Sequence, residues 1–472
     1  MVMNHRIPPE IRHIHLMGIC GTGMGSLAGM LQERGYRVTG SDQAVYPPMS
    51  TFLEKLGIPV RSGYGPENLD PPPDLVIVGN VITRLNPEAR ELLRRDLPCL
   101  SLPQALAHFF LEGKIPLVIT GTHGKTSTSA LLAAVLDVAG LAPGFMVGGI
   151  LRGYERNYQV GSGPYFVIEG DEYDTAFFDK GPKFLHYRPH LAVLTSIEFD
   201  HADIYSDVQA IQAAFARFIA LLPQGGLLAA HGPDPRIQEI LSRAVCPVAT
   251  YGLEDRWDWA AREIRPHPGG TVFRVYRRGQ FYHEFHSPLA GEHNVLNTLA
   301  LMPLLERIGL SPETMAAGVA GFRGVHRRQE VRGVKAGVTV IDDFAHHPTA
   351  VRETLRAIRA QYPGRRLVAV FEPRTNTSRR RIFQTDYPKA LAGADLVVVR
   401  EPPDLAKIAE EERFSSARLV EDVQAAGRPA WYFPDTEGIL DFLRGSLQSG
   451  DVVLIMSNGG FDGLHQRLLD SL

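Results

Sequence analysis

Short apolar runs alternate with helical stretches in the first part of the chain. Apolar strands are predicted over 13–18, 35–42 and 74–79, and an apolar helix over 27–33 lies between the first two. Strands of this length that are separated by helices are typical of a parallel α/β sheet. The pattern therefore predicts an α/β fold for this part of the chain.

The same alternation returns in two further blocks. The second block has predicted strands over 115–120, 165–169 and 191–195, and a helix over 126–138. Residues 250–288 are rich in aromatic residues and arginine, which favours a strand-rich segment. The third block has a helix over 350–359 and four apolar strands over 338–341, 367–370, 395–399 and 451–455.

The length agrees with this division. The chain has 472 residues, which at roughly 150 residues per domain predicts about three domains. The blocks place them at 1–110, 111–322 and 323–472.

Composition narrows the class of protein. With 49 Lys and Arg against 52 Asp and Glu, the net charge is −3, which gives no support for a nucleic-acid partner. Cys20, Cys99 and Cys246 are too far apart for a disulfide framework or a metal knuckle, which favours a reducing compartment. No apolar run is long enough for a signal peptide or a membrane span, so we expect a cytoplasmic protein without a membrane partner.

A glycine-rich turn, GICGTGMG over 18–25, follows the first predicted strand. Backbone N–H groups at such a strand–helix turn bind phosphate, and Asp42 lies about 20 residues on, where a carboxylate reaches a ribose hydroxyl. A nicotinamide dinucleotide and a UDP-sugar diphosphate fit this pattern equally well, and a tight turn without a ligand is the structural alternative.

A second loop, Gly121-Thr-His-Gly-Lys125-Thr126, stands between a predicted strand and a predicted helix. Its amides suit a β-phosphate, Lys125 suits β- and γ-phosphate oxygens, and Thr126 suits Mg²⁺. The loop departs from the usual phosphate-loop pattern because position 119 is Ile, not Gly.

Acidic segments follow the next two strands. Residues 169–174 read EGDEYD and residues 196–203 read SIEFDHAD. Glu169 and His201 are the candidates for binding Mg²⁺ at the strand ends. A solvated acidic loop and a structural histidine are the alternatives.

Three further motifs carry candidate chemistry. His293, Asn294 and Asn297 suit the edge of adenine, although a helix cap explains them as well. Arg327 and Arg328 stand at a block boundary, where arginine reaches a transferring phosphoryl group or forms a basic linker. The segment 342–348, DDFAHHP, pairs carboxylates with histidines at a strand end.

Together these motifs resemble the Mur ligases of peptidoglycan synthesis, in order and over nearly the whole chain. The resemblance implies a UDP-binding Rossmann-like domain, a central phosphate-loop ATPase domain and a C-terminal Rossmann-like domain. It also implies an ATP-dependent amide ligase with Mg²⁺ as cofactor, acting on UDP-N-acetylmuramate through an acyl phosphate.

Within the family, residues 343–348 are similar to the member that adds L-alanine. The stretches 40–50, 371–378 and 456–465 look more like the member that adds the tripeptide L-Ala-γ-D-Glu-meso-diaminopimelate, and we expect this reaction. The chain lacks a lysine between 204 and 216 that some members carbamylate, and it lacks the Asp-Asn-Pro-Arg motif by which one relative reads diaminopimelate. A nucleotide-dependent dehydrogenase and a phosphate-loop binding switch are the alternatives from other classes.

The resemblance and the motifs together give five sets of site residues. The catalytic candidates are Lys125, Glu169, His201 and Arg328, and the metal candidates are Thr126, Glu169 and His201. The ATP candidates are Gly121, Thr122, His123, Gly124, Lys125, Thr126, Ser127, His293, Asn294, Asn297, Arg328 and Asp343. The UDP-sugar candidates are Gly21, Thr22, Gly23, Met24, Ser41, Asp42 and Asn80. The peptide candidates are His346, His347, Arg374, Asn376, Thr377, Ser378, Ser457 and Asn458.

Overall fold

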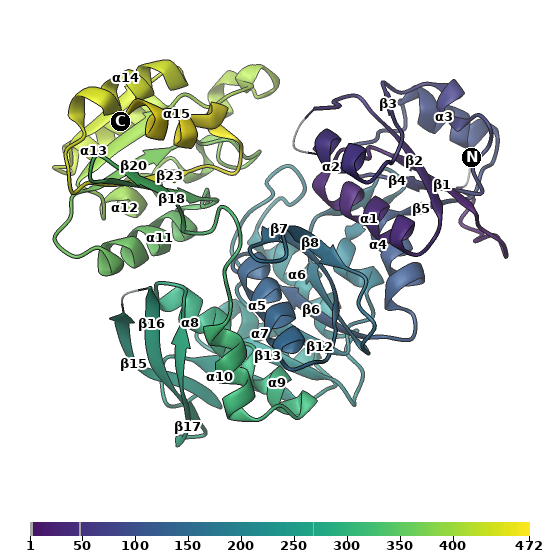
Figure 1. Cartoon of the computed structure of the whole chain (residues 1–472), viewed down its shortest axis with the longest axis horizontal. Helices are drawn as coiled ribbons and strands as arrows, with labels where there is room; N and C mark the ends of the chain where they lie inside the picture. The colour runs from purple at the N-terminus through teal and green to yellow at the C-terminus, as the bar shows by residue number, and fades with distance from the viewer. Residues whose placement is uncertain (1–2, 47–48, 268) are drawn as a thin grey trace.

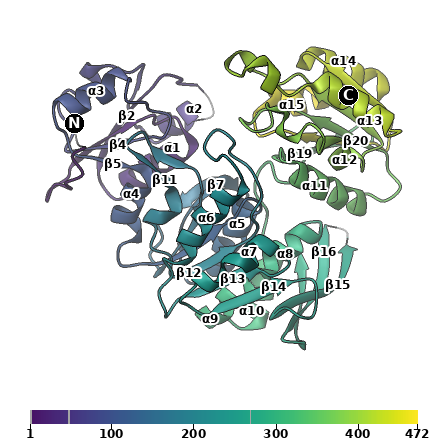
Figure 2. The ribbon, with the colours of Figure 1, turned by 180° about the vertical axis from the view of Figure 1, so that it is seen from behind.

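The computed structural model describes residues 3–46, 49–267 and 269–472, and it shows a mixed α/β protein. In these residues the strands form three large sheets and one two-stranded ribbon. The N-terminal and C-terminal domains lie on opposite sides of the central domain, as Figures 1 and 2 show from the front and from behind. Pro47 and Pro48, within the stretch 40–50, lie outside the described residues.

The N-terminal sheet is parallel, with the strand order β3-β2-β1-β4-β5. Its strands are β1 (His13–Met17), β2 (Arg37–Asp42), β3 (Val60–Ser62), β4 (Leu75–Val78) and β5 (Cys99–Ser101). Its helices are α1 (Thr22–Glu33), α2 (Met49–Lys55), α3 (Pro87–Arg94) and α4 (Leu102–Leu106). The glycine-rich turn is confirmed over 18–21, but the predicted start of the first helix at residue 27 is wrong, because Gly21 caps α1 and residues 22–25 already belong to the helix.

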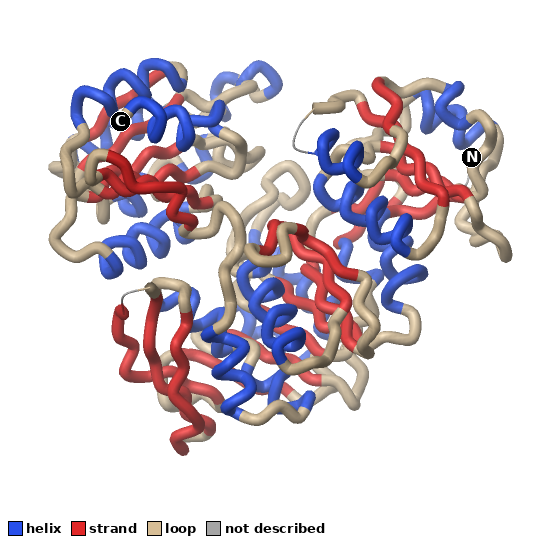
Figure 3. The backbone as a smooth tube through the Cα atoms, in the orientation of Figure 1, coloured by secondary structure: helices blue, strands red, loops and turns tan. Residues whose placement is uncertain are grey.

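The central sheet has the strand order β17-β16-β15-β14-β13-β12-β6-β9-β7-β8. Its strands are β6 (Ile115–Thr120), β7 (Gly144–Leu151), β8 (Arg156–Gln159), β9 (Tyr165–Gly170), β12 (Leu191–Leu194), β13 (Leu227–His231), β14 (Val248–Gly252), β15 (Trp259–His267), β16 (Gly270–Arg277) and β17 (Gln280–Ser287). The two-stranded ribbon is β10 (Asp174–Ala176) with β11 (Asp179–Pro182). The helices are α5 (Lys125–Val138), α6 (Val208–Ile219), α7 (Pro235–Ile240), α8 (Glu292–Leu299), α9 (Met302–Ile308) and α10 (Pro312–Ala320). The antiparallel strands β15, β16 and β17 confirm the strand-rich segment that composition predicts (Figure 3).

The C-terminal sheet has the order β18-β19-β23-β20-β21-β22, and only β18 is antiparallel to its neighbour. Its strands are β18 (Glu330–Lys335), β19 (Val338–Asp343), β20 (Leu367–Phe371), β21 (Leu396–Arg400), β22 (Ala430–Phe433) and β23 (Val452–Met456). The helices are α11 (Pro348–Gln361), α12 (Tyr387–Leu391), α13 (Ser416–Ala425), α14 (Thr436–Ser446) and α15 (Leu464–Ser471). The four strands predicted here are buried along almost their whole length, as a sheet covered on both faces requires.

The central sheet brings three sequence motifs to one edge. Strand β6 pairs in parallel with β12 on one side and with β9 on the other. The phosphate loop and both acidic segments follow the carboxyl ends of these strands, which lie at the same edge because the strands are parallel. None of the helices in the described ranges combines the length and apolar composition needed to cross a membrane.

Helix α1 of the N-terminal domain makes a close contact with β8 of the central domain. This contact predicts how one substitution changes the stability of the fold. A Cβ added to Gly29 in α1 would lie 2.3 Å from the hydroxyl oxygen of Tyr158, a buried residue of β8. We expect Gly29→Ala to lower the free energy of unfolding by about 1–3 kcal/mol through overpacking, against the usual helix preference for alanine.

Thermal unfolding of Gly29→Ala checks this, with Gly445→Ala in α14 as the control. The control position has no atom within 4 Å of an added Cβ, so we expect unchanged or higher stability there. Equal stability of the two variants would contradict the close-contact argument.

Candidate active site

The phosphate loop is shaped by two glycines between β6 and α5. Gly121 has a φ of 122° and Gly124 a φ of 80°, conformations that glycine adopts without steric cost. A Cβ on Gly121 would lie 2.2 Å from the hydroxyl oxygen of Thr195. Gly124 caps α5, whose first-turn amides and dipole favour a bound anion. Thr122 fixes the loop by donating its amide to the Ser196 carbonyl at 2.9 Å.

Lys125 is held by a buried carboxylate. Its Nζ lies 2.9 Å from Glu172 Oε2, and His201 Nε2 lies 3.3 Å from Glu172 Oε1. Burial alone would lower the pKa of Lys125, but the charges of Glu172 and Asp171 raise it above its ordinary value. Lys125 therefore keeps its positive charge beneath the phosphate loop.

Glu172 is the residue of this cluster that sequence reasoning missed. It lies in the acidic segment 169–174, which contains four carboxylates. The sequence pattern does not tell which of them reaches Lys125. The buried position of Glu172, whose side chain is 2% exposed, comes from the fold of the segment after β9.

Thr126, Glu169 and Arg328 meet beside Lys125. The Thr126 hydroxyl donates to Glu169 Oε2 at 3.1 Å and accepts from Arg328 Nη2 at 3.3 Å. Arg328 arrives from the connection to the C-terminal domain, 202 residues further along the chain. Burial and the charge of Asp171 raise the pKa of Glu169. A cation beside Glu169 would offset both effects on this pKa. The Thr126 hydroxyl and the Glu169 carboxylate are oxygen ligands of the kind that Mg²⁺ prefers.

His201, the third metal candidate, contacts a different residue from those that Thr126 and Glu169 contact. His201 pairs with Glu172, which also binds Lys125. The sequence prediction groups His201 with Glu169 because both lie at strand ends of one predicted sheet, and the structure places the two strands, β9 and β12, on either side of β6. The structure brings His201 to the same edge through its contact with Glu172.

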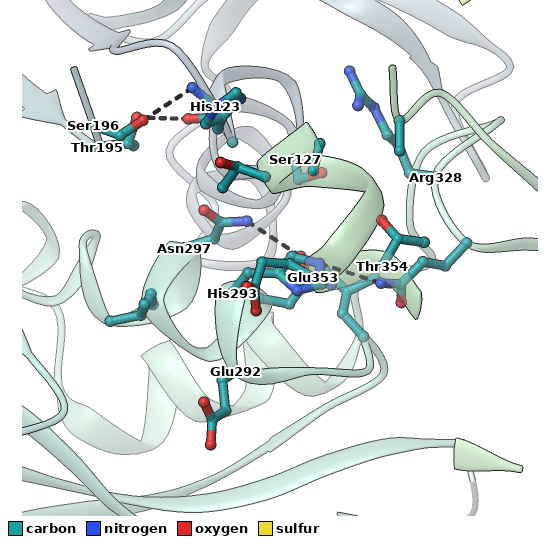
Figure 4. A pocket seen from close by; sticks show the side chains of 18 of the residues that line it. His123, Ser127, Thr195, Ser196, Glu292, His293, Asn297, Arg328, Glu353 and Thr354 are labelled. Carbon is teal, nitrogen blue, oxygen red and sulfur yellow. Dashed lines mark hydrogen bonds between the residues drawn. The ribbon is translucent and has the colours of Figure 1, made fainter. Parts of the chain in front are cut away.

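A cavity opens beside the phosphate loop at the junction of the central and C-terminal domains (Figure 4). The predicted ATP residues that line it are His123, Gly124, Ser127, His293, Asn294, Asn297, Arg328 and Asp343. Burial lowers the pKa of His293 to about 4, so its ring is neutral. Among the described residues its Nδ1 has no hydrogen-bond partner. A neutral ring with a free nitrogen suits the donor–acceptor edge of a purine.

Two of the predicted ATP residues shape the walls of this cavity. Asn294, in the first turn of α8, donates its Nδ2 to the carbonyl of Ala290, just before the helix, at 2.8 Å. The Asp343 carboxylate accepts the amides of Gln329 and Ala345, each at 2.8 Å. Asp343 therefore fixes the connection that carries Arg328.

The N-terminal glycine-rich turn is organised by Asp42. Its Oδ2 accepts the Cys20 amide at 2.9 Å and its Oδ1 accepts the Ala44 amide at 3.0 Å. The Ser41 hydroxyl is buried and donates to Glu88 Oε1 at 2.8 Å. These bonds set the shape of the turn at the end of β2.

A second cavity links this turn with the central domain. Thr22 and Gly23 line it from the start of α1, and Glu169, Asp171 and Lys183 line it from the central domain. Of the other predicted UDP-sugar residues, Gly21 caps α1, Met24 is buried and Asn80 is exposed. The cavity therefore connects the glycine-rich turn to the carboxylates beside the phosphate loop.

Several predicted peptide residues contact the central domain. Asn376 Nδ2 donates to Asp203 Oδ2 at 2.9 Å, and the Thr377 hydroxyl donates to Asp200 Oδ1 at 2.7 Å. His346 Nε2 lies 3.8 Å from Asp200 Oδ2. This part of the C-terminal domain thus lies against the segment that follows β12.

The remaining peptide candidates lie at the ends of β20 and β23. Ser457 donates to the buried Glu372 at 2.5 Å, and Ser378 bonds within its own turn. Arg374 lies 3.6 Å from Glu372 and is 40% exposed, so its guanidinium remains accessible. Asn458 follows Ser457, and its buried Oδ1 has no partner among the described residues.

Comparison with protein families matches three successive segments of the chain. Residues 13–113 match the Mur ligase family catalytic domain, and residues 119–304 match the Mur ligase middle domain. Residues 326–459 match the Mur ligase glutamate ligase domain.

Individual proteins are similar over nearly the whole length. The chain is 39% identical to the UDP-N-acetylmuramate–L-alanyl-γ-D-glutamyl-meso-2,6-diaminoheptandioate ligase of Escherichia coli, covering 97% of this chain and 98% of the relative. It is 31% identical to the UDP-N-acetylmuramate–L-alanine ligase of Caldanaerobacter subterraneus, covering 98% of each. A crystal structure of a murein peptide ligase from Psychrobacter arcticus matches with a TM-score of 0.74 at 34% identity and covers 98% of both chains. The chain belongs to the Mur ligase family.

Proposed function

We propose that this protein is an ATP-dependent ligase that joins the tripeptide L-Ala-γ-D-Glu-meso-diaminopimelate to the lactyl carboxylate of UDP-N-acetylmuramate. One observation carries the proposal: Thr126 bonds both to Arg328, which lines the first cavity, and to Glu169, which lines the second. A phosphoryl donor in the first cavity and a carboxylate in the second would meet at this point.

Each domain then has one task. Residues 1–110 bind the UDP-sugar, with Thr22 and Gly23 at the shared cavity. Residues 111–322 bind ATP, and residues 323–472 supply Arg328 and Asp343 and bind the incoming peptide. The ends of β20 and β23, with the exposed Arg374, suit peptide carboxylates.

The chemistry is phosphoryl transfer followed by acyl transfer. A lactyl carboxylate oxygen attacks the γ-phosphorus of ATP, and the bond to the β-phosphate oxygen breaks, which gives ADP and an acyl phosphate. The alanine amine of the tripeptide then attacks the acyl carbon, loses a proton and displaces phosphate. Lys125 and Arg328 neutralise the two anions that meet in the first step.

Thr126 and Glu169 would hold Mg²⁺, since their oxygens face one another at 3.1 Å in a partly buried place. When bound, the ion supplies positive charge to phosphate oxygens. Glu172 keeps Lys125 charged and positions it below the loop. His293 and Asn297 would contact the adenine from α8.

The acceptor preference tests the proposed reaction directly. We expect kcat/KM with the tripeptide to exceed that with free L-alanine by about tenfold or more, because only the tripeptide engages fixed groups of the C-terminal domain. Phosphate release with UDP-N-acetylmuramate, ATP and each amine measures this. A preference for L-alanine would instead assign the alanine-adding reaction.

Arg374→Ala adds a residue-level test to the same assay. The tripeptide KM should rise by about tenfold, as expected for loss of a charged hydrogen bond, while the ATP KM stays within about twofold. Arg418→Ala is the control, because Arg418 is 65% exposed on α13. An unchanged tripeptide KM in Arg374→Ala would remove this residue from the peptide site.

Lys125→Ala tests the phosphate loop. We expect a loss of about a thousandfold in kcat, because a buried charge that stabilises the transferring phosphoryl group is removed. Lys180→Ala is the control, since Lys180 is 66% exposed and pairs with Asp174. A folded Lys125→Ala variant that retains a tenth of the wild-type rate would contradict the role of Lys125.

A further inference from the structure

The second cavity, between the glycine-rich turn and the phosphate loop, contains one basic side chain. Among the described residues that line this cavity, Lys183 is the only lysine or arginine, and Glu169 and Asp171 are the only acidic residues. Thr22 and Gly23 line the cavity from the N-terminal domain. The steps of the proposed reaction do not involve Lys183.

Two contacts hold the Lys183 side chain at the wall of the cavity. Its Nζ lies 3.2 Å from Asp171 Oδ2 and 4.0 Å from the centroid of the Tyr173 ring, a distance at which an ammonium is attracted to the ring face. The amide of Phe184 donates to the Asp171 carbonyl at 3.4 Å, which ties the backbone of this segment to the one that follows β9. The Lys183 side chain is only 12% exposed, so its charge acts within the cavity more than on bulk water.

Asp171 shows which end of the cavity Lys183 occupies. Burial and the charge of Asp171 both raise the pKa of Glu169, so the two carboxylates are close enough to repel each other. Glu169 in turn accepts the hydroxyl of Thr126 at the phosphate loop. Lys183 therefore lies at the end of the cavity that leads to the phosphate loop, whereas the glycine-rich turn forms another part of its wall.

A carboxylate that enters this end of the cavity needs a cation. It meets Glu169 and Asp171, and a magnesium ion at Glu169 would offset only part of their repulsion. An ammonium group has three N–H donors, and the bond from Lys183 to Asp171 uses one of them. The flexible stem of lysine also lets the group move toward a ligand. Lys183 can therefore bind a second carboxylate while it remains beside Asp171.

We propose that Lys183 binds the lactyl carboxylate of UDP-N-acetylmuramate and so selects this sugar nucleotide over those that lack the carboxylate. The inference rests on the proposed function, because it assigns a contact to that substrate. The carboxylate is favoured over the diphosphate because Lys183 lies at the end near Glu169, while the amides at the start of α1 suit a diphosphate. Lys183 thereby holds the attacking carboxylate beside the phosphate loop.

Equilibrium binding of two sugar nucleotides to the full chain, in the presence of Mg²⁺, tests this contact without any turnover. UDP-N-acetylglucosamine carries the same nucleotide and amino sugar as UDP-N-acetylmuramate but has no lactyl group. We expect the wild type to bind UDP-N-acetylmuramate more tightly. In Lys183→Met the Kd for UDP-N-acetylmuramate should rise by about tenfold or more, because a charged hydrogen bond is lost. The Kd for UDP-N-acetylglucosamine should stay within about twofold.

Matched variants separate a substrate contact from simple pairing with Asp171. Asp171→Asn removes a repelling charge and frees the ammonium, so affinity for UDP-N-acetylmuramate should be kept or increased. Adding Lys183→Met to Asp171→Asn should again weaken binding by about tenfold. Lys183→Arg keeps the charge and should lose less affinity than Lys183→Met. Lys180→Met is the control, because Lys180 is 66% exposed and pairs with Asp174.

Three results would overturn the assignment of Lys183. The first is an unchanged affinity for UDP-N-acetylmuramate in Lys183→Met, and the second is no further loss when this change is added to Asp171→Asn. The third is an equal loss for both sugar nucleotides, which would place the lysine on the shared diphosphate. A wild type that binds neither sugar nucleotide would contradict the proposed function itself. Thermal unfolding of each variant separates loss of the contact from loss of the fold.

Discussion

Charge balance in a buried space is the constraint on which this site depends. Lys125 and Glu172 are only 2.9 Å apart, and the Glu172 side chain is almost fully buried. An unpaired charge in such a place costs several kcal/mol of stability, so each residue offsets the cost of burying the charge of the other. The fold meets this condition by ending β6, β9 and β12 at one edge, where the lysine and the carboxylates come from different segments.

The connection between the second and third domains completes the arrangement. Arg328 adds a second cation by reaching Thr126, and Asp343 holds the connection through the Gln329 amide. On the other side, Asn376 and Thr377 bond to the segment after β12. The first cavity therefore has walls from two domains, so relative movement of these domains would open or complete it.

The sequence predicted the parts of this structure that depend on local pattern. The apolar strands, the parallel sheets and the phosphate loop at Gly121–Lys125 follow from periodicity and from glycine chemistry. It did not predict the start of α1 at Thr22, because Gly23 and Gly25 read as part of the turn although they lie in the first turn of the helix. Glu172 was missed because four carboxylates lie in one short segment, and only the tertiary fold decides which one reaches Lys125.

Contacts between distant segments explain the remaining differences. Asn376 and Thr377 follow an apolar strand, as residues of a peptide site would, yet they contact Asp203 and Asp200 of the central domain. Asp42 likewise has the spacing of a ribose ligand, while its carboxylate accepts the Cys20 and Ala44 amides of its own turn region. The spacing of residues along the chain predicts which edge of a sheet a residue occupies. It does not predict which neighbouring residue its side chain contacts at that edge.

The central claim is that a carboxylate attacks ATP at the point where Thr126 bonds to Glu169 and Arg328. The most direct measurement uses UDP-N-acetylmuramate whose lactyl carboxylate is enriched in the heavy oxygen isotope, with mass analysis of the phosphate released during ligation. An acyl phosphate requires one labelled carboxylate oxygen to leave with each phosphate. Phosphate that carries no label, formed at the same rate as the amide, would contradict this account.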